Sequence, residues 1–313
     1  MKKLVTLLIT LVILLGSLAS CIPAKTEKIN IGVMSGPTGM GMAKLMDDTS
    51  EDSARYSFQI FSDPTLGVQS LQAKTLDMLC LPTNTAANLA IKQSDFLSVI
   101  SINCLGSLYL LTNEGTEINS IADLEGKTVY VSVPNSTTGP IVNYLLEQNG
   151  VSANIQTVSD HDTLVTMLSG NNPPEIVVLP EPKVSAALMK NTSYKVAINL
   201  SEAWDEVSDT PLTMGCIVVR NEFLSENKSA VDSFLRDYKA SIEYIGNESN
   251  LDSAAQMIVD SGVLPALPVA KGALNNLYGS IVYIDGEQMK TALKEFYTAI
   301  NCATPSDDFF YES

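Results

Sequence analysis

The stretch Ile29-Asn30-Ile31-Gly32-Val33-Met34 is followed by Ser35-Gly36-Pro37-Thr38-Gly39 and then by Met40 to Met46. Its apolar residues alternate through the first six positions, the small polar cluster interrupts them, and Met42, Leu45 and Met46 then fall at helical spacing. The stretch therefore predicts a strand, a small polar loop and a helix. Such a unit points unsatisfied backbone N–H groups and the positive end of a helix toward anything bound above the loop.

The same order of strand, polar loop and helix recurs three more times along the chain. The three further units are Met78 to Leu81 with Pro82-Thr83-Asn84-Thr85, Thr128 to Val133 with Pro134-Asn135-Ser136-Thr137-Thr138-Gly139, and Ile176 to Leu179 with Pro180-Glu181-Pro182. Four such units imply parallel sheets, with the polar loops at the carboxyl ends of the strands. Open α/β sheets bind their ligands at these ends.

The length of 313 residues exceeds what one hydrophobic core usually supports, which favours two lobes. Two long apolar stretches, 107–112 and 213–219, bracket the middle of the chain and are predicted to cross between the lobes. Lobe 1 would then comprise residues 28–108 and 218–313, and lobe 2 residues 113–212. The predicted fold class is α/β, with two lobes joined by two crossover strands and two ligand loops in each lobe.

The amino terminus has the composition of an export signal. Lys2 and Lys3 precede an apolar run from Leu4 to Leu15, which is too short to span a membrane, and Leu18-Ala19-Ser20-Cys21 resembles a bacterial lipobox. We expect a signal peptide over 1–20, a lipidated Cys21 and a tether over 21–27. The mature protein would lie in the cell envelope outside the cytoplasmic membrane, held there by its lipid alone. The alternative is a plain secretory signal with a chance cysteine.

The net charge restricts the class of binding partner, and the cysteines raise the question of disulfides. The formal net charge of −16 argues against binding of nucleic acid or anionic lipid by the body of the protein and is typical of a soluble surface. Cys80, Cys104, Cys216 and Cys302 remain after Cys21. An exported protein could pair them, but three of the four lie in or beside apolar runs, so buried free thiols are an equally good interpretation.

Three further motifs carry a resemblance to a known family. They are Asp123-Leu124-Glu125-Gly126-Lys127 before a strand, Leu179-Pro180-Glu181-Pro182, and Ala203-Trp204 before the second crossover. Together with the four loops, they resemble the substrate-binding proteins of bacterial ABC importers, in the NMT1/THI5-like or SsuA-like branch. The resemblance implies a periplasmic-binding-protein type II fold that closes on a solute, acts as a monomer and hands the solute to a membrane permease.

The resemblance also implies which residues bind the ligand. By position these are Ser35, Gly36, Thr38, Gly39, Thr83, Asn84 and Thr85 in lobe 1, and Asn135, Ser136, Thr137, Thr138 and Glu181 in lobe 2. Family ligands also reach residues near the crossovers, which here would be Asn103, Trp204 or Thr213. The alternative role for Ser35, Thr38 and Asn84 is simple capping of the helices that follow them.

The charges in the loops restrict the ligand. Glu181 is the only charged residue in the four loops, and none of the loops contains Lys or Arg. A carboxylate inside a closed cleft must be paired or hydrogen-bonded, which favours an amino, amidine or hydroxyl group on the ligand. We therefore expect a neutral or partly cationic small organic molecule, such as a heterocycle able to stack on Trp204. Glu181 could instead be a solvated carboxylate or could only orient its loop.

Catalytic and metal-binding signatures are weak. His161, the only histidine, is flanked by Asp160 and Asp162 at the expected start of a helix, where an exposed imidazole is the simpler interpretation. No Gly-x-Ser-x-Gly, zinc-protease or nucleotide-binding motif is complete. The sequence thus predicts a binding protein with no catalytic residues, metal or cofactor. Two rival interpretations are an enzyme of the same fold, of the chorismate-dehydrating menaquinone-pathway type, and a ligand-sensing lipoprotein.

Overall fold

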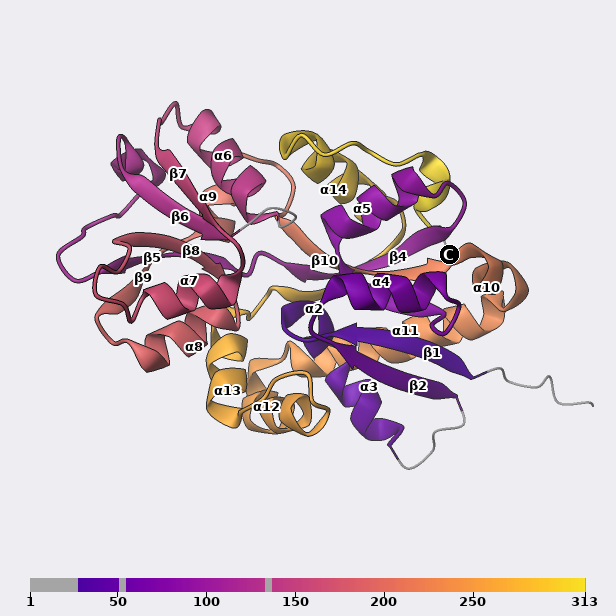
Figure 1. Cartoon of the computed structure of the whole chain (residues 1–313). Coiled ribbons are helices and arrows are strands. Elements are labelled where there is room, and N and C mark those ends of the chain that lie inside the picture. The colour runs from indigo at the N-terminus through magenta and orange to yellow at the C-terminus, as the bar shows by residue number, and fades with distance from the viewer. Residues whose placement is uncertain (1–27, 51–54, 133–136, 313) are drawn as a thin grey trace, which may run out of the picture.

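The computed structural model describes residues 28–50, 55–132 and 137–312, which form two α/β lobes side by side (Figure 1). The predicted signal peptide, Cys21 and the tether lie outside the described residues. The predicted α/β fold class is confirmed, because each lobe is built on its own sheet with helices packed on it. The predicted residue bounds of the lobes stay a prediction, and the names lobe 1 and lobe 2 refer below to the two sheets with their helices.

Lobe 1 contains a six-stranded sheet in the order β11-β4-β10-β3-β1-β2. Its strands are β1 (Ile29–Met34), β2 (Tyr56–Phe61), β3 (Met78–Pro82), β4 (Leu97–Leu105), β10 (Thr213–Arg220) and β11 (Ile281–Ile284). Its helices are α2 (Pro37–Met40), α3 (Ala43–Asp48), α4 (Pro64–Gln72), α5 (Thr83–Lys92), α10 (Asn221–Glu226), α11 (Lys228–Ile245), α12 (Leu251–Asp260), α13 (Leu267–Asn276) and α14 (Gly286–Ala299), with 3-10 turns at Glu248–Asn250 and Asp307–Phe309.

Lobe 2 contains a five-stranded sheet in the order β7-β6-β8-β5-β9. Its strands are β5 (Leu108–Asn113), β6 (Thr128–Ser132), β7 (Asn154–Val158), β8 (Ile176–Pro180) and β9 (Tyr194–Asn199). Its helices are α6 (Thr138–Gln148), α7 (His161–Met167), α8 (Lys183–Lys190) and α9 (Leu200–Asp205), with a 3-10 turn at Ile121–Leu124.

The sheets are mixed, whereas the sequence pattern predicted parallel ones. In lobe 1, β1 pairs in parallel with β2 and β3, and in lobe 2, β6 pairs in parallel with β7 and β8. One strand in each sheet runs antiparallel to both of its neighbours. In lobe 1 this strand is β10, which lies between β3 and β4, and in lobe 2 it is β5, which lies between β8 and β9. The four strands that carry the candidate loops are therefore parallel within each lobe, so that the two loops of each lobe emerge at one edge of its sheet.

The helix predicted after the first loop is split into α2 and α3. Ser241 of α11 causes the split, because its hydroxyl accepts from the Leu45 N–H at 2.9 Å and donates to the Gly41 carbonyl at 2.6 Å. A side-chain hydroxyl thus replaces the helical hydrogen bond that would join these two groups directly. The predicted start of α4 is confirmed, since the Asp63 side chain accepts from the Thr65 N–H and Pro64 occupies the first helical position.

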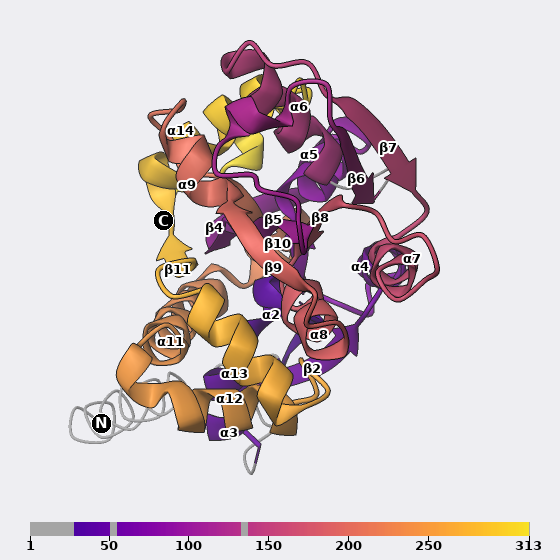
Figure 2. The ribbon, with the colours of Figure 1, turned by 90° about the vertical axis from the view of Figure 1, so that its left-hand side faces the viewer.

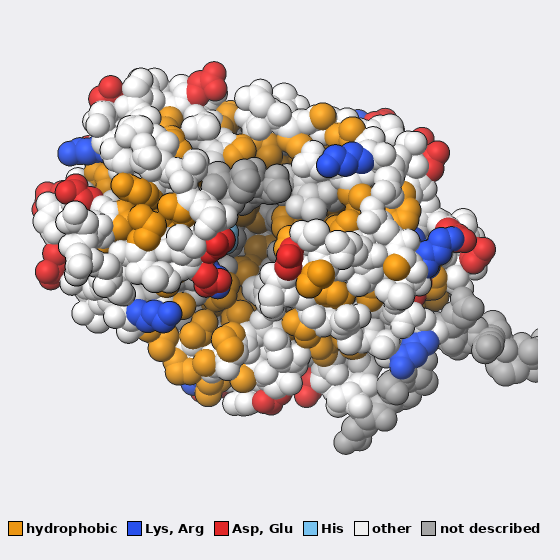
Figure 3. Space-filling view, in the orientation of Figure 1, with side chains coloured by type: hydrophobic (Ala, Val, Ile, Leu, Met, Phe, Trp, Pro, Cys, Tyr) orange, Lys and Arg blue, Asp and Glu red, His pale blue; other side chains and the backbone are white. Residues whose placement is uncertain are grey.

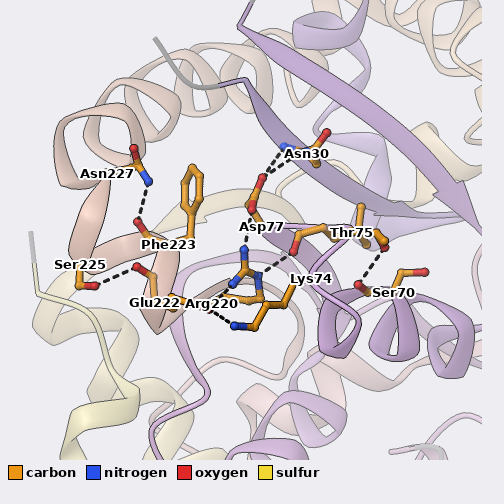
Figure 4. A network of polar contacts seen from close by, with 11 residues as sticks. Asn30, Ser70, Lys74, Thr75, Asp77, Arg220, Glu222, Phe223, Ser225 and Asn227 are labelled. Atoms are coloured by element: carbon orange, nitrogen blue, oxygen red, sulfur yellow. Dashed lines mark hydrogen bonds and ion pairs between the residues drawn. The ribbon is translucent and has the colours of Figure 1, made fainter. Parts of the chain in front are cut away.

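A buried polar network ties the two sequence segments of lobe 1 together (Figure 4). Arg220, at the end of β10, is 2.8 Å from the Asp77 carboxylate, and both side chains are less than a tenth exposed. The other oxygen of Asp77 accepts from the backbone and side-chain N–H groups of Asn30. Arg220 also donates to the Leu76 carbonyl and to Glu222. This network lies at the amino ends of β1 and β3, opposite the candidate loops.

Two further findings concern the state of the cysteines and the character of the helices. The four cysteines of the described residues are free thiols, and Cys80, Cys104 and Cys216 are buried. Among the described residues, none of the helices combines the length and the apolar character needed to cross a bilayer.

Candidate ligand-binding site

A hollow runs between the two lobes in the space-filling view, with acidic side chains on both of its sides (Figure 3). The candidate loops of the two lobes approach each other. A Cβ placed on Gly36, after β1, would lie 3.6 Å from Pro182, after β8. Thr137, at the start of α6, donates to the sulfur of Met214 in β10 at 3.8 Å. The loops that the sequence assigned to different lobes therefore meet across the molecule.

The residues at the N-cap positions of α2 and α5 are not those that the alternative interpretation named. Gly36 precedes α2 and Pro82 precedes α5, and neither supplies a side-chain cap. Ser35 is exposed, and Asn84 is buried within the first turn of α5. The other loop residues differ in burial: Gly36 and Gly39 are buried, and Thr38 and Thr85 are partly buried. Thr83 is fully buried, and its hydroxyl donates to the Thr213 carbonyl.

Two buried oxygen atoms beside these loops lack a hydrogen-bond partner among the described residues. They are Oδ1 of Asn103 in β4 and Oγ1 of Thr213 in β10, on side chains that are 1 % and 0 % exposed. The Asn103 amide is oriented by its nitrogen, which donates to the Thr38 carbonyl and to the Tyr238 hydroxyl. Oδ1 is consequently an acceptor that is fixed in place and unsatisfied.

The surroundings of these two oxygens place them at the base of the loops. A Cβ placed on Gly215 would lie 2.6 Å from Asn103 Oδ1 and 2.8 Å from Thr38 Oγ1. Thr213 is two residues before Gly215, and the neighbouring Met214 is the residue contacted by Thr137 of lobe 2. Both oxygens therefore belong to residues that adjoin the lobe 1 loops, Asn103 beside Thr38 and Thr213 beside Thr83.

The lobe 2 loop after β6 is described only from Thr137 onward. Thr137 and Thr138 are buried, 5 % and 2 % exposed. Asn135 and Ser136, the other residues predicted in this loop, lie outside the described residues. Their role stays a prediction.

Glu181 is buried and is held by protein groups, so it is not a solvated carboxylate. Its side chain is 1 % exposed and accepts hydrogen bonds from the Asn276 side chain at 2.5 Å, the Ser185 hydroxyl at 3.1 Å and the Ser185 N–H at 3.2 Å. Burial raises the pKa of the Glu181 carboxyl, while these hydrogen bonds lower it. In this conformation its oxygens are engaged by Asn276 and Ser185.

Trp204 is a core side chain in this conformation. It is 0 % exposed, its indole N–H donates to the Thr210 carbonyl at 2.7 Å, and its ring lies 4.7 Å from that of Tyr144 and 5.7 Å from that of Phe296. Tyr144 belongs to lobe 2 and Phe296 to lobe 1. The indole therefore fills the junction of the lobes, and its predicted contact with a ligand stays a prediction that this burial does not favour.

The imidazole of His161 is partly buried, so the expectation of an exposed imidazole is wrong. Asp160 caps α7, as its position suggested, by accepting from the Thr163 N–H. The His161 ring turns inward, and its Nδ1 lies 2.6 Å from the Ser132 hydroxyl at the end of β6. Burial, together with the nearby charge of Lys183, lowers the pKa of His161 from 6.5 to about 4.

This depressed pKa predicts a pH-dependent loss of stability. The unfolded chain protonates His161 near pH 6.5 and the folded chain only near pH 4, so the unfolded state binds more protons between these values. The contribution of His161 to folding is therefore full above pH 6.5 and falls by up to about 3 kcal/mol as the pH drops toward 4. His161→Asn should show a shallower fall of melting temperature over this range than the wild type. An equal fall of the melting temperature in the two proteins between pH 6.5 and pH 4 would contradict the assignment.

Three residues at this site were not predicted from the sequence: Lys183, Ser132 and Asn276. Lys183 begins α8 directly after the fourth loop, and Asp162 neutralises it at 2.6 Å. Ser132 was interpreted only as part of a strand. Asn276 ends α13, more than ninety residues from Glu181, and no local pattern marks it as its partner. The unique histidine and the last residue of a loop-bearing strand were the signals available for the Ser132–His161 pair.

The family of the chain is shown by its sequence. A family model described as menaquinone biosynthesis matches residues 54–301. The chain belongs to the menaquinone biosynthesis family. No curated protein matches it. This match does not confirm the predicted membership of the NMT1/THI5-like branch, which stays a prediction.

Solved structures of low sequence identity share the fold. An ABC transporter protein from Parabacteroides distasonis matches with a TM-score of 0.73 and 19 % identity, covering 91 % of this chain and 99 % of that one. The periplasmic aliphatic sulphonate binding protein SsuA from Escherichia coli matches with a TM-score of 0.70 and 16 % identity, covering 91 % and 92 %. SsuA from Xanthomonas axonopodis pv. citri, bound to MOPS, matches with a TM-score of 0.68 and 14 % identity, covering 93 % and 100 %. These matches confirm the predicted periplasmic-binding-protein fold.

The family match corrects one prediction. The sequence signatures suggested that the protein is not an enzyme, but the family is named for a biosynthetic pathway and is a family of enzymes. The prediction failed because it relied on recognisable catalytic motifs. This family shares the fold of binding proteins, so a search for hydrolase, zinc or nucleotide motifs does not detect it.

Proposed function

We propose that the protein captures a small neutral or partly cationic organic molecule between its two lobes. The unsatisfied oxygens beside the loops, the amide acceptor Asn103 Oδ1 and the hydroxyl Thr213 Oγ1, support this proposal. A buried oxygen without a partner destabilises a protein by about 1–3 kcal/mol, and a ligand that donates N–H or O–H groups would remove that penalty on binding. Asn103 Oδ1 can only accept, so it favours a donor on the ligand over an anionic oxygen.

The proposal includes a location and a partner. The lipobox-like Leu18-Ala19-Ser20-Cys21 supports anchoring of the protein by a lipid outside the cytoplasmic membrane. The fold that it shares with ABC importer components supports delivery of the captured molecule to an ABC permease. Closure of the lobes would then be the state that the permease recognises.

The test begins with a thermal-shift screen of amines, pyrimidines, nucleosides, sulfonates including MOPS, and nitrate. A ligand that binds the folded state raises the melting temperature. We expect nitrogenous or hydroxylated compounds to stabilise the protein. Stabilisation by sulfonate or nitrate alone would contradict the proposed ligand class.

Thr213→Val then tests the acceptor directly with the compound that the screen identifies. The substitution replaces an unsatisfied hydroxyl with a methyl group of similar size, so the ligand-free protein should melt at the same temperature or higher. Binding should weaken roughly 5- to 30-fold, which corresponds to about 1–2 kcal/mol.

Thr112→Val is the matched control. Its hydroxyl is also buried and without a partner among the described residues, but it lies on β5 beside Ile176, at the end of β8 away from Glu181. It should leave binding unchanged. Equal affinities for the two variants, measured by calorimetry, would remove Thr213 from the site.

A second candidate function is chemical conversion of the bound molecule, and the family match favours it. The conversion would be the dehydration of chorismate or a related step of menaquinone biosynthesis. The neutral imidazole of His161, beside the Ser132 hydroxyl, is a proton-accepting group of lobe 2 that such a step could use. Product formation from chorismate by the purified protein, lost in His161→Asn with binding retained, would establish it. Binding without turnover would exclude chorismate as the substrate.

A further inference from the structure

Glu181 connects three parts of the molecule. Its backbone N–H donates to the carbonyl of Ser107, in the first crossover, at 2.9 Å. Its carboxylate accepts from the N–H and hydroxyl of Ser185 in α8, the helix that follows the loop. Its third link, the hydrogen bond from Asn276, comes from α13 and joins lobe 2 to lobe 1. The carboxylate therefore belongs at once to the loop after β8, to the crossover and to the interface between the lobes.

The end of α13 is attached to lobe 2 by a second hydrogen bond. The hydroxyl of Tyr109, in β5, donates to the backbone carbonyl of Asn276. Asn276 thus presents its carbonyl to one strand of lobe 2 and its side-chain amide to the loop after another. Burial and the nearby Glu181 charge raise the pKa of Tyr109, so its hydroxyl stays protonated and able to donate at neutral pH.

The helices α8 and α13 are in close contact at this point. Figure 2 shows α13 between α12 of lobe 1 and α8 of lobe 2. A Cβ placed on Gly272 of α13 would lie 2.7 Å from the Ser185 hydroxyl, closer than such atoms approach without a shift. Glycine at this position lets α13 approach the residue that also binds Glu181.

The burial of Glu181 depends on this contact. A buried carboxylate must be compensated by hydrogen bonds, and one of the three groups that donate to the Glu181 carboxylate comes from Asn276 of the other lobe. Separation of the lobes would remove Asn276 and admit water in its place. The contact between the lobes is thus coupled to one carboxylate–amide pair.

We propose that Glu181 and Asn276 form a latch that holds the two lobes in contact. Glu181 is then a positioning residue that acts on the lobes through Asn276, not a group that contacts the ligand. The latch consists of protein groups alone, so it can be tested on the purified protein whether or not the proposed ligand class is correct.

Asn276→Asp is the variant that tests the latch. It keeps the size of the side chain but places a second carboxylate against that of Glu181, and like charges in such contact repel. At pH 8 we expect the ligand-free variant to shift to a larger radius of gyration in small-angle X-ray scattering. Asn276→Leu, which removes the donor without adding charge, should shift in the same direction by less.

The matched control is Asn250→Asp. Asn250 also lies at a helix terminus and donates through its side chain, but to the Tyr244 carbonyl within lobe 1, so the variant adds the same charge and loses one hydrogen bond without touching the interface. It should keep the wild-type radius. Circular dichroism of all variants verifies that each remains folded.

The double variant Glu181→Gln with Asn276→Asp exchanges the two groups and restores an amide–carboxylate pair across the lobes. It should return the radius of gyration toward that of the wild type. The latch is overturned if Asn276→Asp keeps the radius of the Asn250→Asp control, or if the exchanged pair is as expanded as Asn276→Asp alone. A structural role confined to α13 would not produce this rescue.

Discussion

Arg220→Met should destabilise the protein by about 3–5 kcal/mol, the loss typical when one partner of a buried ion pair is removed. Arg220 and Asp77 are 9 % and 8 % exposed in their side chains, and the arginine supplies the donor to one carboxylate oxygen of Asp77. Without Arg220, Asp77 would be a buried charge that keeps only the two hydrogen bonds from Asn30. Urea denaturation should show the loss as a lower midpoint.

Two further variants separate this buried pair from charge effects in general. Arg55→Met removes an ion pair with Asp237 in which the side chains are 48 % and 32 % exposed, so it should change stability by at most about 1 kcal/mol. Asp77→Asn combined with Arg220→Met removes both charges of this pair and should be more stable than Arg220→Met alone. A double variant that is less stable than the single one would show that Asp77 stabilises the fold mainly through its hydrogen bonds from Asn30, and not as the partner of Arg220.

Gly39→Ala should displace the first candidate loop and destabilise lobe 1 by about 3 kcal/mol, the upper end of the range for overpacking. A Cβ at this position would lie 1.9 Å from the Met34 carbonyl oxygen and 2.8 Å from a methyl group of Val33. The Met34 carbonyl cannot withdraw easily, because the next residue, Ser35, donates its N–H to the Phe61 carbonyl of the neighbouring strand. Thermal melting measures the loss.

Gly139→Ala provides the comparison for this substitution. Gly139 occupies the first turn of α6, as Gly39 does in α2, but a Cβ there would meet nothing within 4 Å. Alanine is the better helix former, so this variant should be stabilised by about 0.5–1 kcal/mol. Equal effects of the two substitutions would show that the steric contact at Gly39 is relieved without cost.

The local order of elements was predictable because it depends on neighbouring residues. Alternating apolar residues marked β1 and β2, and Asp63-Pro64 marked the start of α4. Long-range effects were not predictable. The break between α2 and α3 comes from Ser241, about two hundred residues away in the chain, and the antiparallel pairing of β10 follows from where the chain returns.

The candidate site was predictable in its loops but not in its contacts. The positions of the loops follow from the strand pattern, whereas the partner of Glu181 and the burial of Trp204 depend on how the lobes meet. A tryptophan near a crossover was a reasonable ligand contact by composition. Its indole N–H is instead used by a carbonyl six residues away.

The position of β10 in the sheet of lobe 1 determines an order of assembly during synthesis. Lobe 2 has all five of its strands once the chain reaches residue 199, whereas β3 and β4 cannot gain the strand between them until residue 220 has been made. A nascent chain between these lengths would expose two apolar strand edges, which are sites of aggregation. Lobe 2 is therefore complete while lobe 1 still has a gap at its centre, and the last third of the sequence closes that gap.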